Sequence, residues 1–317
     1  MKIAAYTIGD INRASSRLRS FYLFEMGKEF NLDVIRPDRY RDAVGVDVVH
    51  IQKKLNVKTI IAVMIYRLLG IKVIFDIDDQ PVGKKAFIGY FLVLFFSSVI
   101  TVDTEARKQF WSSFFFKKII IINDIADSND LSLKINVRNF KLNPHGFFWI
   151  GYSGNLASIS DFISLVKNYK PYKLTVATEQ SAITLFKKNY PFVEFFPWFD
   201  GIANDHCINA RFMILNHKYD SSALLKSDNK MVLAILAGFI PIVSRTPSYA
   251  KLANLLEADF LIFDSEAEII EISKKLSAVD LNQFYKNSIS YINAHYSREA
   301  VLSEFNSKIL CRLTTNL

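Results

Sequence analysis

The strongest constraint on the fold of this chain is a regular alternation of short apolar runs with longer helical stretches along its 317 residues. The apolar runs are rich in Val and Ile and lack a clean polar–apolar alternation, which is typical of parallel strands covered on both faces. In the first part of the chain we expect strands at 2–8, 32–36, 47–52, 72–77, 98–103 and 118–123, and helices at 15–30, 57–69, 84–96 and 104–112. Right-handed crossovers between such units give a doubly wound sheet.

The pattern breaks between residues 127 and 144 into Ser, Asn and Asp, which indicates a linker. Beyond it we expect strands at 147–152, 173–177, 193–196, 211–215, 240–244 and 260–263, and helices at 158–168, 180–188, 222–237 and 267–276. The last stretch, 282–313, predicts one or two helices and no further strand.

The predicted fold is therefore α/β, with two Rossmann-like, doubly wound parallel-sheet domains facing a cleft, and with C-terminal helices. We expect the first domain to cover residues 1–143 and the second 144–317, with the last helix free to pack back on the first domain. Ligands of open α/β sheets bind at the carboxyl ends of the strands, so we expect the site there.

Composition excludes several classes of function. Cys207 and Cys311 lie far apart, with no CxxC motif and no Cys/His cluster, which argues against a disulfide scaffold or a zinc site and favours the reducing cytoplasm. The N-terminus indicates a first strand rather than a signal peptide. The net charge of +8 suits an anionic membrane or a phosphorylated small molecule better than nucleic acid, because no nucleic-acid motif accompanies it. Neither a dinucleotide fingerprint nor a P-loop is present, and we expect no cofactor and no metal.

One uncharged apolar segment, 86–102, approaches the length of a membrane span. The Ser97-Ser98 break and the β-branched run after it favour a buried helix to about Phe96, followed by a core strand.

A polar turn with two lysines is the most informative motif. Residues 226–230 read Lys-Ser-Asp-Asn-Lys and open a helix that ends at Gly238, before a strand that contains Pro241. Helix N-termini offer free N–H groups and a partial positive charge to phosphate. The expected phosphate-binding residues here are Lys226, Ser227, Asp228, Asn229 and Lys230. A solvated lysine pair at an ordinary helix start is the alternative.

This stretch resembles the C-terminal signature of GT-B glycosyltransferases, of the family-4-like, bacterial surface-polysaccharide type. The resemblance falls on Ser227, Asn229, Lys230, Gly238 and Pro241, and it implies that the second domain binds the sugar donor while the first faces the acceptor. One departure is clear. Many retaining members carry a Glu-x7-Glu pair, and the matching positions here are Leu225 and Leu233. Ribose recognition, donor identity and stereochemistry therefore stay open.

Two further motifs fit the same family pattern. Residues 151–155, Gly-Tyr-Ser-Gly-Asn, follow the first strand of the second domain, and the family uses that turn for donor contacts, which implies roles for Gly154 and Asn155. Residues 15–19, Ser-Ser-Arg-Leu-Arg, are similar to the start of several polysaccharide-building transferases, and Arg17 or Arg19 would hold a phosphate. A plain turn and surface arginines are the alternatives. The run 47–53 also fits, although its His50 is more typical of a structural role.

Three aspartates, Asp76, Asp78 and Asp79, end a predicted buried strand and are the candidate catalytic residues. In a transferase they would act as general base on the acceptor hydroxyl or orient it. The same run also resembles the nucleophile motif of haloacid-dehalogenase phosphatases, which use Mg²⁺, but the usual Gly-Thr and the late acidic motif are missing. Purely structural caps are the third interpretation.

The aromatic and lysine-rich run 110–118 suits a membrane interface or, alternatively, a helix end packed on the next strand. Together these features predict a cytoplasmic glycosyltransferase, left open as peripheral on the inner membrane face, that moves a sugar from an activated phosphate donor to a glycan or lipid-linked acceptor, as in capsule or O-antigen assembly. A nucleotide-sugar epimerase, the phosphatase and a non-catalytic sugar-phosphate-binding module are the alternatives.

Overall fold

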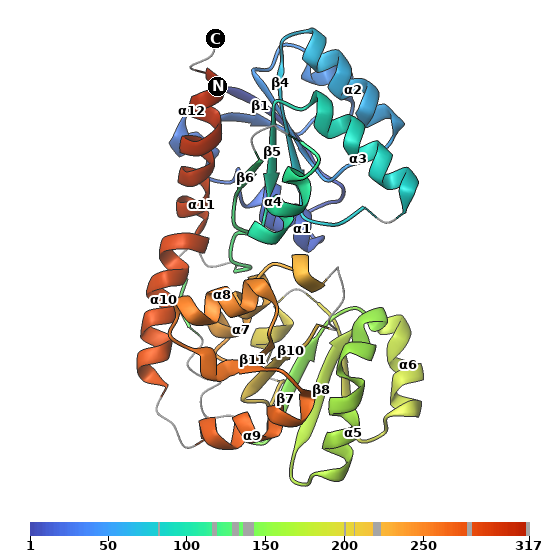
Figure 1. Ribbon diagram of the computed structural model, residues 1–317, viewed down its shortest axis with the longest axis vertical. Coiled ribbons are helices and arrows are strands. Elements are labelled where there is room, and N and C mark those ends of the chain that lie inside the picture. Colours follow the sequence, from blue (N-terminus) through green and yellow to red (C-terminus); the bar gives the residue numbers. More distant parts are fainter. Residues whose placement is uncertain are drawn as a thin grey trace. The chain divides into compact units, whose positions relative to one another are not determined.

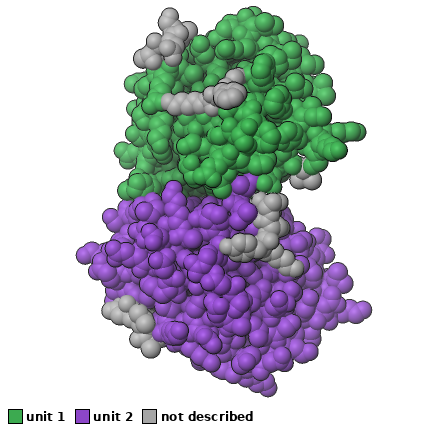
Figure 2. Space-filling view, viewed as in Figure 1, with its two compact units in different colours: residues 1–127, 294–317 green, residues 128–293 purple. Residues whose placement is uncertain are grey.

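The computed structural model describes residues 1–81, 83–115, 119–128, 133–135, 143–199, 201–205, 207–217, 223–277 and 281–314. The chain forms two compact units, one of Met1–Asp127 with Ala294–Leu317 and one of Ser128–Asn293 (Figure 2). The division falls after Asp127 rather than at the expected 143/144, and the C-terminal segment belongs to the first unit. Each unit contains a six-stranded parallel sheet, so the predicted α/β architecture is confirmed.

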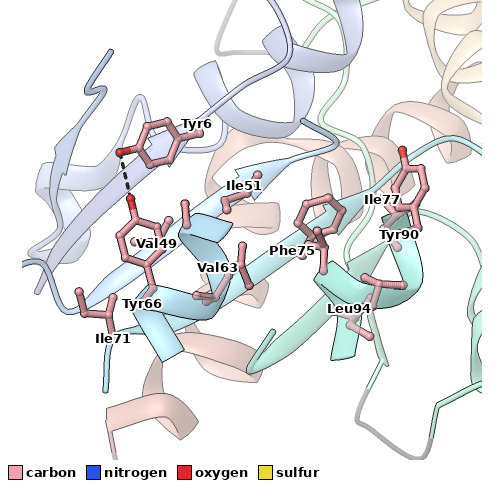
Figure 3. Packing of buried hydrophobic residues seen from close by; sticks show 14 of the residues in the cluster. Tyr6, Val49, Ile51, Val63, Tyr66, Ile71, Phe75, Ile77, Tyr90 and Leu94 are labelled. Carbon is pink, nitrogen blue, oxygen red and sulfur yellow. Dashed lines mark hydrogen bonds between the residues drawn. The ribbon is translucent and has the colours of Figure 1, made fainter. Parts of the chain in front are cut away.

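The sheet of the first unit has the strand order β2-β1-β3-β4-β5-β6, and its ladders are all parallel. The strands are β1 (Lys2–Tyr6), β2 (Asp33–Ile35), β3 (Val48–Gln52), β4 (Lys72–Ile77), β5 (Val99–Val102) and β6 (Ile119–Ile121). The helices α2 (Val57–Leu68), α3 (Lys84–Phe96) and α4 (Glu105–Ser112) connect strands β3 to β6 and contribute to one apolar cluster (Figure 1). In that cluster, Val63 and Tyr66 of α2 and Leu94 of α3 pack on the sheet residues Val49 and Phe75 (Figure 3).

A second apolar cluster lies on the other side of this sheet. It joins the segment after β1 to helix α11 (Arg298–Phe305), through Leu18, Phe24, Leu302 and Phe305. The continuous helix expected at 15–30 is wrong, because the chain forms a short α1 (Ala14–Ser16), a π-helical turn (Arg17–Phe21) and a 3₁₀ turn (Gly27–Phe30). The π-helical turn holds the two buried arginines described below.

Helix α3 departs from its predicted burial. The strand after it, β5, is buried as expected, but Ile88, Phe91, Leu92 and Phe95 of α3 face solvent. Over the described part of the aromatic run 110–118, helix α4 contacts the next strand, β6, as the alternative interpretation expects, and Trp111 is fully buried and stacks on Phe87 of α3. Phe114 of the same run is half exposed. Residues 116–118 lie outside the described residues.

The sheet of the second unit has the order β12-β11-β10-β7-β8-β9, again parallel throughout. Its strands are β7 (Gly146–Ile150), β8 (Lys173–Thr178), β9 (Glu194–Pro197), β10 (Phe212–Leu215), β11 (Ile240–Ser244) and β12 (Ile262–Phe263). Its helices are α5 (Ser160–Asn168), α6 (Gln180–Asn189), α7 (Asn229–Leu236), α8 (Pro247–Leu255) and α9 (Glu266–Ser277). Strand β7 therefore pairs with β8 on one side and β10 on the other, so the strand order reverses there.

Two helices of this unit differ from expectation. The helix predicted at 222–237 is shorter, because a 3₁₀ turn (Ala223–Leu225) and a break at Lys226–Asp228 come before α7. Helix α8 was missed, although Thr246 followed by Pro247 at the first helical position is a start signal.

The C-terminal region contains helices and no strand among its described residues, as predicted. Helix α10 (Asn282–Tyr296) is followed by α11, a π-helical turn (Asn306–Leu310) and α12 (Cys311–Thr314). The Ser297 hydroxyl caps α11 by accepting a hydrogen bond from the Ala300 N–H at 3.2 Å. Within the described parts of the chain, no helix combines the length and the apolar content that crossing a bilayer requires.

Candidate active site

A pocket of about 440 Å³ lies in the second unit, at the carboxyl ends of β7 and β10. These are the strands at which the strand order reverses, and such a switch point is where open α/β sheets bind ligands. The pocket is lined by Trp149, Ile150, Tyr152, Gly154, Asn155, Ala157, Ser158, Ile214, Leu215, Asn216, His217, Ala223, Lys226, Ser227, Asn229, Lys230 and Tyr249. The sequence motifs at 151–155 and 226–230 thus meet in one place.

The positive charge of the pocket comes from Lys226 and Lys230 beside the first turn of α7. The Lys230 side chain is partly buried, and its ammonium donates a hydrogen bond to the Ile150 carbonyl at 3.0 Å. Burial, reinforced by the nearby charge of Lys226, lowers the pKa of Lys230 to about 8. A partly buried ammonium next to a second lysine and a helix N-terminus creates a site that favours an anion.

Two polar atoms in the pocket wall lack a hydrogen-bond partner among the described residues. They are Oδ1 of Asn229 and Oγ of Ser158, and both are buried. Buried polar atoms are rarely left unpaired, because an unmade hydrogen bond costs about 1–3 kcal/mol. Both positions therefore favour a polar ligand, which would supply the missing partner.

The far wall of the pocket is held rigid by neighbouring polar contacts. His217 Nε2 lies 3.2 Å from the Tyr249 hydroxyl, and the two rings stack at 5.6 Å. The Asn216 amide donates to Oε1 of Glu266 at 2.7 Å. Sequence analysis missed Asn216, His217 and Tyr249. For Asn216 and His217 the signal was their position as a polar pair directly after the apolar strand β10, at its carboxyl end; Tyr249, in helix α8, had no such signal.

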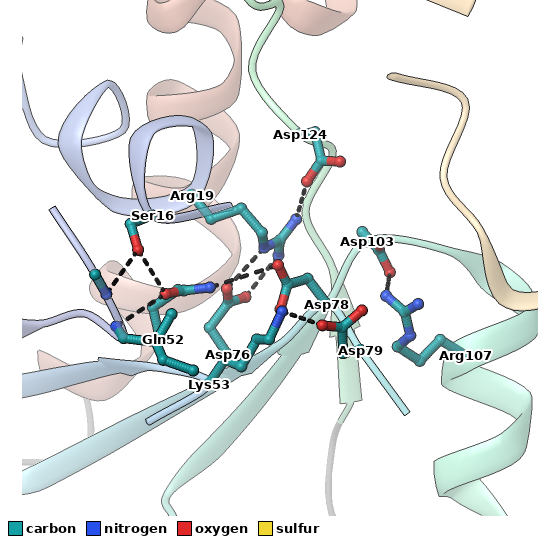
Figure 4. Close-up of polar contacts among 12 residues, drawn as sticks. Ser16, Arg19, Gln52, Lys53, Asp76, Asp78, Asp79, Asp103, Arg107 and Asp124 are labelled. Atoms are coloured by element: carbon teal, nitrogen blue, oxygen red, sulfur yellow. Dashed lines mark hydrogen bonds and ion pairs between the residues drawn. The ribbon is translucent and has the colours of Figure 1, made fainter. Parts of the chain in front are cut away.

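A dense ion-pair network lies at the carboxyl end of the sheet in the first unit (Figure 4). Arg19 donates from Nε and Nη2 to both carboxylate oxygens of Asp76, at 2.7 and 2.6 Å, and from Nη1 to Asp124 at 2.7 Å. The hydroxyl of Thr101 also donates to Asp76, at 2.6 Å. Burial opposes ionisation of Asp76, but Arg19 outweighs it and the pKa of Asp76 falls below its usual value.

Asp78 and Asp79 lie next to this network but have a different partner, Lys53 (Figure 4). The Lys53 ammonium contacts Asp79, which is half exposed, and lies 3.4 Å from Oδ1 of Asp78. Asp78 and Lys53 therefore form an ion pair, but its geometry gives no hydrogen bond, and Oδ1 of Asp78 has no hydrogen-bond partner among the described residues. Burial raises the pKa of Asp78, and Lys53 offsets this only in part.

No protein-family model matches this sequence, and no curated protein matches it in sequence. Solved structures do match its fold. An alpha-glucosyltransferase in complex with UDP gives a TM-score of 0.66 at 11% identity, over 98% of this chain and 100% of the other. Anabaena HepE in complex with UDP and glucose gives 0.67 at 9% identity, over 98% and 100%. Sucrose-phosphate synthase from Thermosynechococcus elongatus gives 0.68 at 10% identity, over 100% of both chains.

The chain has the GT-B fold. The matching structures are GT-B glycosyltransferases and cover nearly the whole chain, in agreement with its two parallel six-stranded sheets. At these identities the likeness concerns the fold. The roles of individual residues in this GT-B chain are therefore argued from their own geometry.

Of the residues predicted to bind donor phosphate, six line the GT-B pocket of the second unit. They are Gly154, Asn155, Lys226, Ser227, Asn229 and Lys230. Asp228 instead occupies the N-cap position of α7 and is not among the lining residues. Its carboxylate would repel a phosphate, so we withdraw the expected contact and assign Asp228 to the helix start.

Arg17 and Arg19 do not fit the predicted phosphate role. Arg17 is 2% exposed and pairs with both oxygens of Asp127, at 2.9 and 2.8 Å, while its Nη1 donates to the Ile11 carbonyl. Arg19 is similarly buried and engaged with Asp76 and Asp124. A guanidinium has five N–H donors, and in both residues most of them already bond to the protein. We therefore interpret both arginines as positioning residues of the first unit.

The predicted structural role of His50 agrees with its surroundings. The ring is buried and packs edge-on against Phe24 and Phe305, at 5.2 and 5.9 Å. Burial lowers the pKa of His50 to about 4, so the imidazole is neutral near neutral pH.

Proposed function

We propose that this protein is a glycosyltransferase that moves a sugar from a nucleotide-sugar donor to a growing glycan or lipid-linked acceptor. One observation carries the proposal: the switch-point pocket of a GT-B chain brings Lys226, Lys230 and the start of α7 together. The fold supports it, because GT-B structures that match this chain are complexes with UDP, or with UDP and glucose.

The diphosphate of the donor would lie against Lys226, Lys230 and the N-terminus of α7. In sugar transfer the departing nucleoside diphosphate gains negative charge, and preorganised cations stabilise this charge most strongly in a site that excludes water. The Lys230 ammonium suits that role, because its hydrogen bond to the Ile150 carbonyl already holds it in place before the reaction. The two buried atoms without a hydrogen-bond partner, Oδ1 of Asn229 and Oγ of Ser158, would bind polar groups of the donor.

Among the three candidate aspartates, Asp78 is the one we assign to the acceptor hydroxyl. Asp76 has both oxygens occupied by Arg19. Asp79 is half exposed and makes the closer of the two Lys53 ion pairs, whereas Lys53 lies 3.4 Å from Asp78. Asp78 keeps one oxygen without a hydrogen bond and has a raised pKa, as a general base requires. The same engagement of Asp76 argues against the phosphatase alternative, whose first aspartate must attack phosphorus.

The acceptor is proposed to be a bacterial surface glycan, such as capsule or O-antigen, built at the cytoplasmic membrane face. The support is the family-4-like motif at 226–241 and the fold-level match to a lipopolysaccharide outer core galactosyltransferase, WaaB, at a TM-score of 0.60 and 10% identity.

Calorimetric titration with UDP, GDP and TDP sugars tests the donor assignment. We expect one of them to bind, and Lys226→Ala to weaken it about tenfold or more, since a hydrogen bond to a charged group contributes about 1.5–3 kcal/mol. Lys187→Ala removes an exposed lysine from α6 and is the matched control. Unchanged affinity in a folded Lys226→Ala variant would refute the phosphate site. Product analysis then separates transfer from epimerisation, phosphate release or binding without turnover.

A further inference from the structure

Helix α2 exposes a continuous apolar stripe. Thr59, Ala62, Val63 and Tyr66 face the core, as expected for an amphipathic helix. The opposite face should then be polar. Instead it presents Val57, Ile61, Met64, Ile65 and Leu68, which follow one another at helical spacing, and Leu68 is 86% exposed.

Helix α3 has the same unusual outer face. Tyr90, Val93 and Leu94 are buried, while Ile88, Phe91, Leu92 and Phe95 are exposed at spacings of three and four residues. Helices α2 and α3 pack against each other and lie side by side on one flank of the first unit (Figure 1), so the two stripes belong to neighbouring helices. We call this surface the α2–α3 face. An apolar helix of this kind is normally covered, and a contiguous exposed patch indicates a binding surface.

The charged side chains of the two helices are all positive, whereas the adjoining loop also carries Asp38 and Asp42, the latter 3.7 Å from Arg41. The helices carry Lys58, Arg67, Lys84 and Lys85 and contain no Asp or Glu. A pocket of about 500 Å³ adjoins the N-terminus of α2, where Arg39, Arg41 and Lys54 join Lys58, with Asp38 as its one carboxylate. Apolar side chains flanked by lysine and arginine match a bilayer with anionic lipids. The acyl region of such a bilayer accepts the apolar side chains, and its headgroups attract the lysines and arginines.

We propose that the α2–α3 face docks this protein on an anionic lipid surface, with the basic pocket receiving headgroup phosphate. The face is too short to span the bilayer, so the attachment is peripheral. Charge complementarity favours lipid over a protein partner, because a protein interface of this size would need carboxylates spaced to meet each cation. This docking surface deepens the proposed function. It depends on that function only in one respect, the proposal that the acceptor is linked to a lipid. The donor pocket belongs to the other unit.

Vesicle co-sedimentation with the full chain tests the proposal. We expect binding to phosphatidylglycerol-containing vesicles, weaker binding to pure phosphatidylcholine, and further loss at high salt. Leu68→Glu and Phe95→Glu should each lower partitioning about tenfold or more. Leu185→Glu is the matched control, since Leu185 is an exposed leucine on α6 close to Lys187 and Lys188. UDP titration of every variant shows whether the donor pocket is intact.

A second readout guards against variants that misfold. Phe95→Trp should keep the fold and shift its fluorescence to shorter wavelength when phosphatidylglycerol vesicles are added. No vesicle binding by the unmodified chain, or an equal loss in Leu185→Glu, would overturn the proposal. So would self-association without lipid that Leu68→Glu abolishes, which would make a second copy the occupant. Vesicle binding without binding of any sugar nucleotide would leave the surface standing and count against the transferase.

Discussion

Asp76 and Asp78 lie two residues apart, yet their environments are opposite. Asp76 is fixed by a bidentate pair with Arg19, whereas Asp78 is buried with one oxygen unbonded. The sequence placed both at a strand end and offered no means of telling them apart. The distinction depends on Arg19, 57 positions from Asp76, which pairs with Asp76 and with Asp124 only once the sheet has folded.

The two aspartates should respond differently to removal of charge. Asp76→Asn leaves the buried Arg19 underpaired and should cost about 3–5 kcal/mol of unfolding free energy. Because the folded pKa of Asp76 lies below its ordinary 3.8, this stabilisation is present at neutral pH and fades as the pH falls below that value. Asp78→Asn should change stability by less than about 1 kcal/mol, since burial of the carboxylate is unfavourable and one of its oxygens makes no hydrogen bond that the substitution would remove.

Urea unfolding measures both effects, and turnover separates them further. Asp78→Asn should lose sugar transfer while its affinity for the donor stays unchanged. A stability loss in Asp78→Asn as large as that in Asp76→Asn would contradict the assignment.

Lys230 predicts a pH dependence of donor binding. Its folded pKa is lowered to about 8, and a bound diphosphate would raise it again. Binding therefore takes up a proton above pH 8, and the dissociation constant should rise about tenfold per pH unit over the next one to two units. Lys230→Met should bind the donor weakly and without this pH dependence. It should be at least as stable at neutral pH, because it removes a charge whose partial burial already lowers its pKa. Calorimetric titrations in buffers of different ionisation enthalpy measure the proton uptake directly. The same pH profile of donor binding in Lys230→Met would refute the role of Lys230.

At the scale of elements, strand β7 positions the pocket and starts at a crowded glycine. A Cβ on Gly146 would lie 2.5 Å from the Asn209 carbonyl and 2.8 Å from the Ala210 Cα, both backbone atoms that have little room to move. A Cβ on Gly154, in the pocket wall, would meet nothing within 4 Å.

This contrast gives a matched pair of substitutions. Gly146→Ala should destabilise the second unit by about 1–3 kcal/mol, because β7 must shift from its neighbours. Gly154→Ala should leave stability within about 0.5 kcal/mol but weaken donor binding, since its methyl group enters the pocket. Thermal unfolding with and without UDP distinguishes the two. Equal destabilisation by both would show that Gly154 is a packing position instead.

Most strands were predictable because their signal is local. A short run rich in Val and Ile, such as Val48–Gln52 or Ile240–Ser244, predicts a buried strand from neighbouring residues alone. The π-helical turn at Arg17–Phe21 was not predictable, because its two arginines pair with carboxylates far along the chain. Local sequence does not reveal those pairs. The exposure of α3 was not predictable either. In sequence, the apolar outer face of α3 looks like the face of a buried helix. Only the fold shows that, among the described residues, no other element covers it.

At the scale of the molecule, the first unit is built from both ends of the chain. Val301, Leu302, Phe305 and Ile309 are fully buried in the same cluster as Ile3 and Leu18. The second unit is the uninterrupted segment Ser128–Asn293, with its own sheet and pocket.

Truncation after Asn293 should therefore affect the units unequally. Each lost core side chain contributes about 1.5–3 kcal/mol, so together they rival the total stability of a typical domain, about 5–15 kcal/mol. We expect the first unit to lose cooperative unfolding while the second still binds the donor. Truncation after Cys311 spares the four core residues and serves as control. Loss of donor binding together with the first unit would show that the second does not fold alone.

The sequence by itself determined the α/β class, the parallel sheets, and the two motifs, 151–155 and 226–230, that meet in the pocket, because apolar periodicity and turn chemistry are properties of neighbouring residues. Only the tertiary structure decided which arginine holds which carboxylate, that Asp78 keeps an unbonded oxygen, and that α2 and α3 present apolar stripes outward. Those features depend on contacts between segments far apart in the chain, and on which helix faces are left uncovered once the sheet has assembled.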